Sequence, residues 1–119
     1  MTSDPDMAHL ILEKDGSRVA YAIVRGVRNP PVLELLRVVV SSPGQGYGRI
    51  LLQSLKKYAF IDHQYDRFWL DVAEENIRAL TLYQSEGLVL EDAMNAANKA
   101  ANVQPYYAIL SIYRADYLN

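Results

Sequence analysis

The feature of this sequence that most constrains its fold is a change of hydrophobic period across one glycine-rich segment. Residues 32–40 form a mostly aliphatic run, which is typical of a buried β-strand. After Pro43 to Gly48, the run 47–61 places its apolar side chains at helical spacing, at Leu51, Leu52, Leu55 and Ala59. A strand that leads through a glycine-rich turn into an amphipathic helix predicts an α/β protein.

Two strand-like runs precede this unit. Residues 7–12 and 18–25 flank Asp15-Gly16, a dipeptide that favours a tight hairpin turn. Both alternating faces of 18–25 are apolar, so this strand is expected to be covered on both sides. An antiparallel pair of N-terminal strands is therefore predicted ahead of the strand at 32–40.

The second half of the chain repeats the change from strand to helix. Further strands are predicted at 67–72, 88–90 and 106–113. A helix is predicted at 74–86 and ends at Gly87, while 91–103, rich in alanine and asparagine, is expected to be a loop that can hold helical turns. An antiparallel meander followed by βαβα units predicts an α+β mixed sheet with helices packed on it. The length fits a single domain, 1–119.

The composition argues against several kinds of site. The chain has no cysteine, which excludes disulfides, thiolate metal sites and a cysteine nucleophile. The two histidines, His9 and His63, are too far apart in sequence to suggest a metal site. A net charge of −2 argues against a nucleic-acid footprint. No apolar stretch approaches the roughly 20 residues of a membrane span, and the N-terminus lacks a signal-peptide pattern, so a cytoplasmic protein is expected.

The glycine-rich segment is also the strongest chemical signal. Gly44, Gly46 and Gly48 lie at the start of a helix, where backbone N–H groups lack intrahelical partners. Glycines let phosphate oxygens approach this backbone, and the helix dipole favours their negative charge. The segment lacks the Gly-Lys-Ser/Thr of nucleoside-triphosphate loops, and its glycine spacing does not fit a dinucleotide fold. Either a diphosphate-binding loop or a plain strand-to-helix turn explains these residues.

Motifs on both sides of the loop occur in a familiar order. Leu70-Asp71-Val72 ends the following strand, and the next helix carries one further set of spaced residues: Asn76, Ala79, Tyr83 and Gly87. With Gly46 and Gly48, these motifs resemble the GNAT superfamily of N-acetyltransferases, whose pattern is Gln/Arg-x-x-Gly-x-Gly/Ala, Leu-acidic-Val and Asn-x-x-Ala-x-x-x-Tyr-x-x-x-Gly-Phe. The resemblance covers about residues 34–90 and looks closest to the branch related to ribosomal-protein and polyamine acetylation.

The chain departs from that family pattern in three places. Pro43 stands at the Gln/Arg position, and Leu88 replaces the usual phenylalanine. The region before Val32 supplies two strands, but not the first strand and the pair of helices that line the acceptor side in this family. The resemblance therefore implies the family's fold, with a V-shaped opening between the central strands, and an acceptor side without its N-terminal helices.

The resemblance also implies that acetyl-CoA binds in this opening. Backbone groups of Val38, Val39 and Val40 would pair with its pantetheine arm as an added strand does, although these residues equally suit an ordinary core. The residues implied in diphosphate binding are Gly44, Gln45, Gly46, Tyr47, Gly48 and Arg49. Arg49 would neutralise the diphosphate or would only be solvated. Asn76 would bond the pantetheine arm or cap the second helix.

Two residues are implied in catalysis. Tyr83 would act as the general acid, because a phenol with a pKa of about 10 can protonate a departing thiolate with a pKa of about 8.5 at little cost. It also suits a half-buried packing tyrosine. Asp71, twelve residues earlier, lies where relatives place an acidic residue that relays a proton from the amine, or else caps the next helix or forms a salt bridge. Glu34 is an alternative base.

These features predict an N-acetyltransferase that moves the acetyl group of acetyl-CoA directly to a primary amine of a small molecule or peptide. The alternative is a non-catalytic CoA-binding or protein-interaction module of the same fold. The short N-terminal half leaves an apolar sheet face with few helices to cover it, so self-association as a homodimer is expected. No metal, nucleic-acid or membrane partner is expected.

Overall fold

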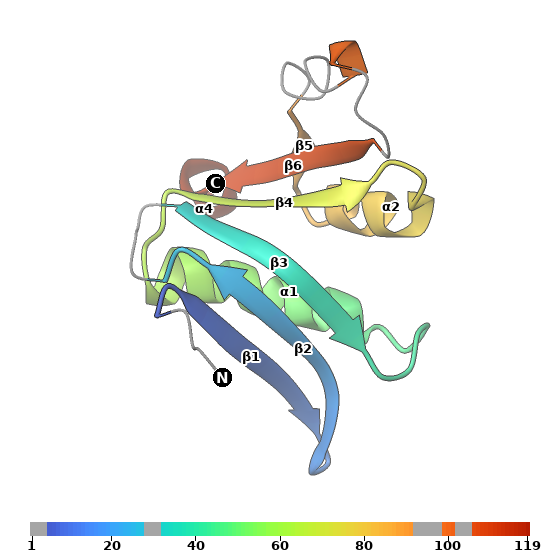
Figure 1. The fold of residues 1–119 in the computed structure, drawn as a ribbon. Coiled ribbons are helices and arrows are strands. Elements are labelled where there is room, and N and C mark those ends of the chain that lie inside the picture. The colour runs from blue at the N-terminus through green and yellow to red at the C-terminus, as the bar shows by residue number, and fades with distance from the viewer. Residues whose placement is uncertain (1–4, 28–31, 92–98, 102–105) are drawn as a thin grey trace.

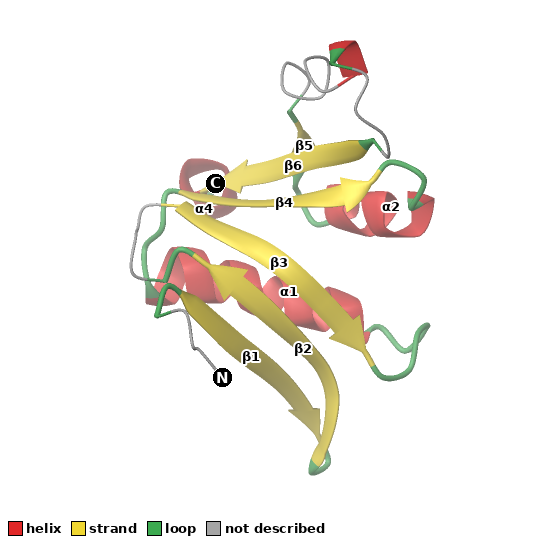
Figure 2. Cartoon of the chain, viewed as in Figure 1, coloured by secondary structure: helices red, strands yellow, loops and turns green. Residues whose placement is uncertain are grey.

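A computed structural model of the chain describes residues 5–27, 32–91, 99–101 and 106–119. The described residues form one six-stranded sheet in the order β1-β2-β3-β4-β6-β5, with helices packed on it (Figures 1 and 2). The strands are β1 (Met7–Lys14), β2 (Ser17–Arg25), β3 (Val32–Val40), β4 (Arg67–Ala73), β5 (Val89–Leu90) and β6 (Tyr107–Tyr113). The helices are α1 (Tyr47–Lys57), its π-helical continuation η1 (Tyr58–Asp62), α2 (Ile77–Ser85) and α4 (Arg114–Leu118).

The mixed α+β sheet predicted from the sequence is confirmed, with a few changes at its ends. The helix predicted at 74–86 begins later, because Glu74 and Glu75 form a turn before Asn76 caps it. The short helix α4 follows β6 directly and was not predicted. The loop predicted at 91–103 lies mostly outside the described residues, which stop at Glu91 and resume at Lys99 for three residues.

The N-terminal hairpin forms as its turn residues predict. Asp15 and Gly16 both have positive φ, 52° and 80°, as a tight turn between twisted strands requires. β1 then pairs with β2 from Met7 opposite Arg25 to Lys14 opposite Ser17, and β2 pairs antiparallel with β3. The meander therefore supplies one half of the sheet, and β4, β6 and β5 supply the other (Figure 1).

Strand alternation gives the sheet two different faces. The residues that point toward the helices are almost fully buried, namely Ala20, Ala22, Val24, Leu33, Leu35, Phe68, Leu70, Ala108 and Leu110. They form one core with Leu51, Leu52, Leu55 and Ala59 of the first helix, which is the apolar set predicted from its spacing. Small alanines on β2 leave room for α1, which crosses behind β2 and β3 in Figure 1.

The opposite face of the sheet is not covered by any helix of the described residues. Tyr21 and Ile23 of β2 are only half-buried there, and Ile11 is 49% exposed. The expectation that residues 18–25 are covered on both sides was therefore wrong for the described part of the chain. The reason is that an apolar, β-branched alternation reports a strand's propensity as well as its burial, and the two cannot be separated by pattern alone.

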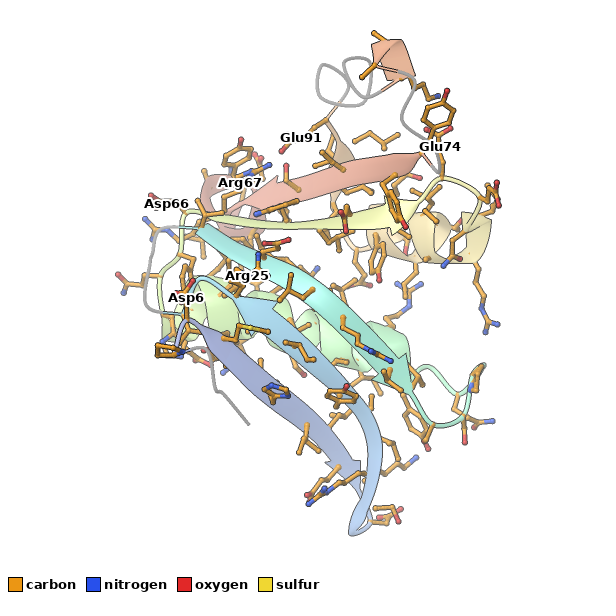
Figure 3. All side chains as sticks on the ribbon, viewed as in Figure 1. Asp6, Arg25, Asp66, Arg67, Glu74 and Glu91 are labelled. Atoms are coloured by element: carbon orange, nitrogen blue, oxygen red, sulfur yellow. The ribbon has the colours of Figure 1, made fainter. Side chains whose placement is uncertain are left out.

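Polar contacts on this open face connect strands β4 and β6 with the residue that follows β5. Arg67, at the start of β4, forms an ion pair with Glu91, which follows β5 (Figure 3). The guanidinium carbon also lies over the rings of Trp69 and Tyr113, at 5.6 and 6.0 Å from their centroids. Hydrogen bonds from Ser111 and Arg67 hold the pKa of Glu91 below its usual value. These contacts link β4, β6 and the residue after β5 at the end of β4 remote from Glu74.

The central strands diverge, and this divergence creates the predicted V-shaped opening. β3 and β4 pair in parallel only along a short segment, which joins Val32–Leu35 of β3 to Arg67–Leu70 of β4. β3 continues to Val40 and β4 to Ala73 without further pairing between them. The backbone of the second half of β3 is thus open on the side that faces β4, while its other side remains paired with β2.

Candidate active site

A groove runs from the end of β3, past the glycine loop, to the first turns of α2. It has a volume of about 550 Å³. Its lining consists of Val40, Pro43, Gly44, Gly46, Tyr47, Gly48, Arg49, Asn76, Arg78, Ala79 and Leu82. The fold therefore brings most of the predicted loop residues together with Asn76, which lies on a different helix. Gln45, Val38 and Val39 do not line this groove.

The loop backbone has the geometry that an anion site needs. Gly46 is the N-cap of α1 and has a φ of 80°, a left-handed conformation that favours glycine. The N–H of Ile50 is the first to bond back into the helix, to the Gly46 carbonyl oxygen at 3.1 Å. The N–H groups of Tyr47, Gly48 and Arg49 therefore begin the helix without intrahelical acceptors. Space at Gly46 is open, since a Cβ atom there would meet nothing within 4 Å.

Two arginines stand on opposite walls of this groove. Arg49, in the first turn of α1, is paired with Glu86 at 2.5 Å rather than being free in solvent. Arg78, in the first turn of α2, faces the loop, with its terminal nitrogen 3.9 Å from where a Cβ of Gly44 would lie. It forms no ion pair within the described residues. Sequence reasoning missed Arg78; the signal was a cation placed two residues after Asn76 on the helix predicted to border the groove.

Asn76 occupies the helix-cap position that was one of its two predicted roles. Its side-chain oxygen accepts a hydrogen bond from the N–H of Ala79 at 3.1 Å. This bond satisfies one of the unpaired donors at the start of α2 and orients the side chain. Asn76 also lines the groove, so its role as a cap does not exclude the second predicted role.

The three valines of β3 divide between the two faces of the sheet. Val38 and Val40 pack against the core, while Val39 is 38% exposed on the open face. Their side chains thus serve the sheet, as the core interpretation predicts. Their backbone lies beyond Leu35, the last residue of β3 that pairs with β4. Backbone groups that face the opening are in the right place for an added strand.

Tyr83 lies on α2, half-buried against the core and outside the lining of the groove. Its carbonyl oxygen accepts the N–H of Leu88 at 3.1 Å, which helps to end the helix. Burial raises the pKa of the Tyr83 phenol above its usual value of 10.0. The phenol therefore keeps its proton at neutral pH, as a general acid must.

The two acidic candidates lie together on the open face, at the point where the central strands part. Asp71 is the first residue of β4 beyond the segment that pairs with β3, and Glu34 lies within the segment of β3 that pairs with β4. Burial raises the pKa of Glu34, Arg25 at 3.6 Å opposes this shift, and the charge of Asp71 adds to it. Helix α2 packs on the other face, so the sheet separates these carboxylates from Tyr83 except through the opening.

No group of histidine, aspartate or glutamate side chains that could hold a metal ion occurs among the described residues. In the same part of the chain, every helix is too short or too polar to cross a membrane.

The splayed sheet and the glycine loop at a helix N-terminus are two fold features that the resemblance to N-acetyltransferases predicts. The sequence profile of the acetyltransferase (GNAT) family matches residues 1–88, and the chain belongs to this family. No curated protein sequence matches the chain at a significant level.

Solved structures show the same fold at low sequence identity. Spermidine N-acetyltransferase from Vibrio cholerae, in complex with CoA and spermine, aligns over 97% of this chain and 70% of its own, with 18% identity and a TM-score of 0.78. Campylobacter jejuni N-acetyltransferase PseH, in complex with acetyl coenzyme A, aligns over 92% of this chain and 70% of its own, with 17% identity and a TM-score of 0.73.

Proposed function

We propose that this protein, acting as one domain over residues 1–119, transfers an acetyl group from acetyl-CoA to a primary amine. The observation that carries the proposal is the groove in which a glycine-rich helix N-terminus meets the unpaired end of β3. Such a groove suits a ligand with a phosphorylated end and a peptide-like arm, which is the chemistry of coenzyme A. The relatives crystallised with CoA or acetyl coenzyme A support the same choice.

The coenzyme would lie along the groove in one direction. The N–H groups of Tyr47, Gly48 and Arg49 would bind the diphosphate, helped by the dipole of α1. Arg78, on the opposite wall, adds a positive charge near Gly44. The amides of the pantetheine arm would pair with the backbone of Val38 to Val40 and with the amide nitrogen of Asn76. This places the thioester at the fork between β3 and β4.

The reaction would then be a direct transfer between two bound substrates. The neutral amine attacks the thioester carbonyl carbon, a C–N bond forms and the C–S bond breaks. The departing thiolate takes its proton from the phenol of Tyr83, and the amine loses a proton to Asp71, with Glu34 as the second candidate. Water restores both groups. Burial around Glu34 raises its pKa, which makes it a better base than an exposed carboxylate.

The acceptor would approach from the open face of the sheet. Asp71 and Glu34 lie there, and carboxylates at the mouth of the opening suit an acceptor that carries positive charge, such as a small amine or a peptide amine. One relative of the same fold is a spermidine N-acetyltransferase. We propose a cytoplasmic enzyme for this class of acceptor.

The proposal is tested by acetyl-CoA binding to a glycine variant with a matched control. Gly46 and Gly16 both have a φ of 80° and open space around a Cβ atom, so alanine should cost each position about 1 kcal/mol of stability. Only Gly46 lies at the groove. We expect Gly46→Ala to weaken acetyl-CoA binding about tenfold, the equivalent of 1.4 kcal/mol, because the methyl group occupies space needed by phosphate oxygens.

Isothermal titration calorimetry on the parent, Gly46→Ala and Gly16→Ala gives the comparison, with NAD and ATP as ligands that should bind poorly. If the two variants bind acetyl-CoA with equal affinity, the glycine loop is only a structural turn and does not bind the diphosphate. If the parent does not bind acetyl-CoA at hundreds of micromolar, the proposed activity is wrong. If it binds acetyl-CoA but acetylates no polyamine, amino acid or peptide, a non-catalytic CoA-binding module becomes the better explanation.

We also propose that the protein forms a homodimer through the part of the open sheet face that lies over β1, β2 and the far end of β3, which leaves Asp71 accessible to the acceptor. Large apolar side chains are exposed there, including Ile11 and Val39, which are 49% and 38% exposed. An exposed patch of this kind on a small domain favours a second copy. Light scattering should give twice the mass of the chain at micromolar concentration. A single monomeric mass over a hundredfold range of concentration would argue against it.

A further inference from the structure

One carboxylate, that of Glu86, connects the end of α2 to the first helix. Its side chain is 9% exposed. Arg49 Nη1 lies 2.5 Å from Oε2, Lys56 Nζ lies 3.1 Å from Oε1, and Gln53 Nε2 lies 3.4 Å from Oε2. Arg49, Gln53 and Lys56 follow one another at helical spacing along a single stripe of α1. Glu86 is thus the common acceptor of that stripe.

The two cations of this cluster are held very differently. The Lys56 side chain is 10% exposed, and its ammonium also donates to the Glu86 carbonyl oxygen at 2.6 Å. The Arg49 side chain is 46% exposed and lines the groove on its other side. If Arg49 moved away, the Glu86 carboxylate would keep Lys56 and Gln53 as partners. No buried charge would be left alone, which is the usual obstacle to breaking such a pair.

We infer that Glu86 is a positioning residue for the coenzyme: it holds Arg49 at the edge of the groove in the free protein and releases it to a bound diphosphate, while retaining Lys56. The inference rests on the proposed function of the groove. Arg49 is then a phosphate ligand that is shared between two anions, and Glu86 competes with the coenzyme for it. None of the hydrogen bonds and ion pairs of this cluster involves Arg78, which therefore serves as the comparison.

The charge of Glu86 persists across the working pH range. Burial alone would raise its pKa, but hydrogen bonds from Lys56 and Arg49, with the charge of Lys56, outweigh burial and lower it. The groups facing this carboxylate are Arg49, Gln53 and Lys56, and both charged ones are cations. The competition for Arg49 is therefore present at neutral pH and disappears only when acid protonates Glu86.

A double-mutant cycle separates competition from a merely structural role. We expect Glu86→Gln to tighten coenzyme A binding about two- to fivefold at low salt, the size of an exposed ion pair, because Arg49 is no longer shared. The same change should have no effect in an Arg49→Gln background and should keep its full effect in an Arg78→Gln background. Equal effects in all three backgrounds, or weaker binding in the parent background, would overturn the inference.

A second measurement uses the unaltered protein, so it does not depend on variants that fold. The side-chain NMR signals of Arg49 should shift on addition of inorganic diphosphate, and the ammonium signal of Lys56 should stay. If diphosphate binds and the Arg49 signals do not move, the inference is wrong while the groove remains an anion site. If diphosphate shifts Arg49 and coenzyme A does not bind, Glu86 shares Arg49 with a phosphate anion other than coenzyme A, and the proposed activity fails. Binding of neither ligand rejects both.

Discussion

Replacing Tyr83 with phenylalanine is expected to lower turnover about 10²- to 10⁴-fold and to leave acetyl-CoA affinity nearly unchanged. The ring of Tyr83 packs against the core and phenylalanine preserves that packing. The hydroxyl is the only group removed. If it protonates the departing thiolate, its interaction exists mainly in the transition state, so the rate falls and binding does not.

The protonation state of the hydroxyl suits the role of an acid. Burial raises the pKa of Tyr83, so the phenol is protonated at every pH at which the protein would work. The protonated form is the active one for an acid, so Tyr83 should not limit the rate until the pH exceeds 10. A fall in rate on the acid side must come from the amine or from its base. Burial also raises the pKa of Glu34, and a base with a raised pKa loses activity at a higher pH as the solution is acidified.

Tyr58 provides a matched control for this variant. It too is half-buried, packs against the core and has a pKa raised by burial. It lies on η1, which contributes no residue to the groove, whereas α2, which carries Tyr83, contributes Ala79 and Leu82. Tyr58→Phe should therefore turn over like the parent. The acceptor must first be found by screening polyamines, amino acids and short peptides. If Tyr83→Phe and Tyr58→Phe are equally active, Tyr83 is a packing residue and water protonates the thiolate.

The local parts of the fold were predictable because each has a short-range cause. The strand at 32–40 was predicted with the bounds of β3, since its aliphatic run ends sharply at Ser41. Asp15-Gly16 and Gly87 also marked real boundaries, because a positive φ is a property of single residues. The first helix was predicted from the helical spacing of its apolar residues. That spacing continues to Ala59, beyond the point at Tyr58 where the helix becomes π-helical.

The parts of the site that were missed depend on distant contacts. The ion pair between Arg49 and Glu86 joins residues that are 37 positions apart in the sequence, and the local sequence around either residue does not indicate its partner. Arg78 was overlooked because its importance comes from the loop that it faces across the groove. The coverage of residues 18–25 was wrong for a similar reason. Whether an apolar strand face is covered depends on how many helices the whole chain supplies.

One glycine whose importance no local pattern indicates should have the largest effect on stability. Gly26 follows β2, is buried and has a φ of 105°. A Cβ atom there would lie 2.2 Å from the carbonyl oxygen of Val32, a backbone atom that cannot turn aside. Its N–H donates to the Asp6 carbonyl oxygen at 2.9 Å, and its own carbonyl oxygen accepts the Tyr65 hydroxyl at 3.0 Å.

Gly26 therefore ties together the start of β1, the end of β2 and the segment before β4, at the corner where Figure 3 labels Asp6 and Arg25. Gly26→Ala should lower the free energy of unfolding by about 3 kcal/mol or more, because backbone strain and a backbone clash act together. Gly16→Ala, with positive φ but no clash, should lose only about 1 kcal/mol. Urea denaturation of both variants gives the difference directly. Equal losses would mean that the strand β3 shifts to admit the methyl group, and that this corner does not fix the register of β2 against β3.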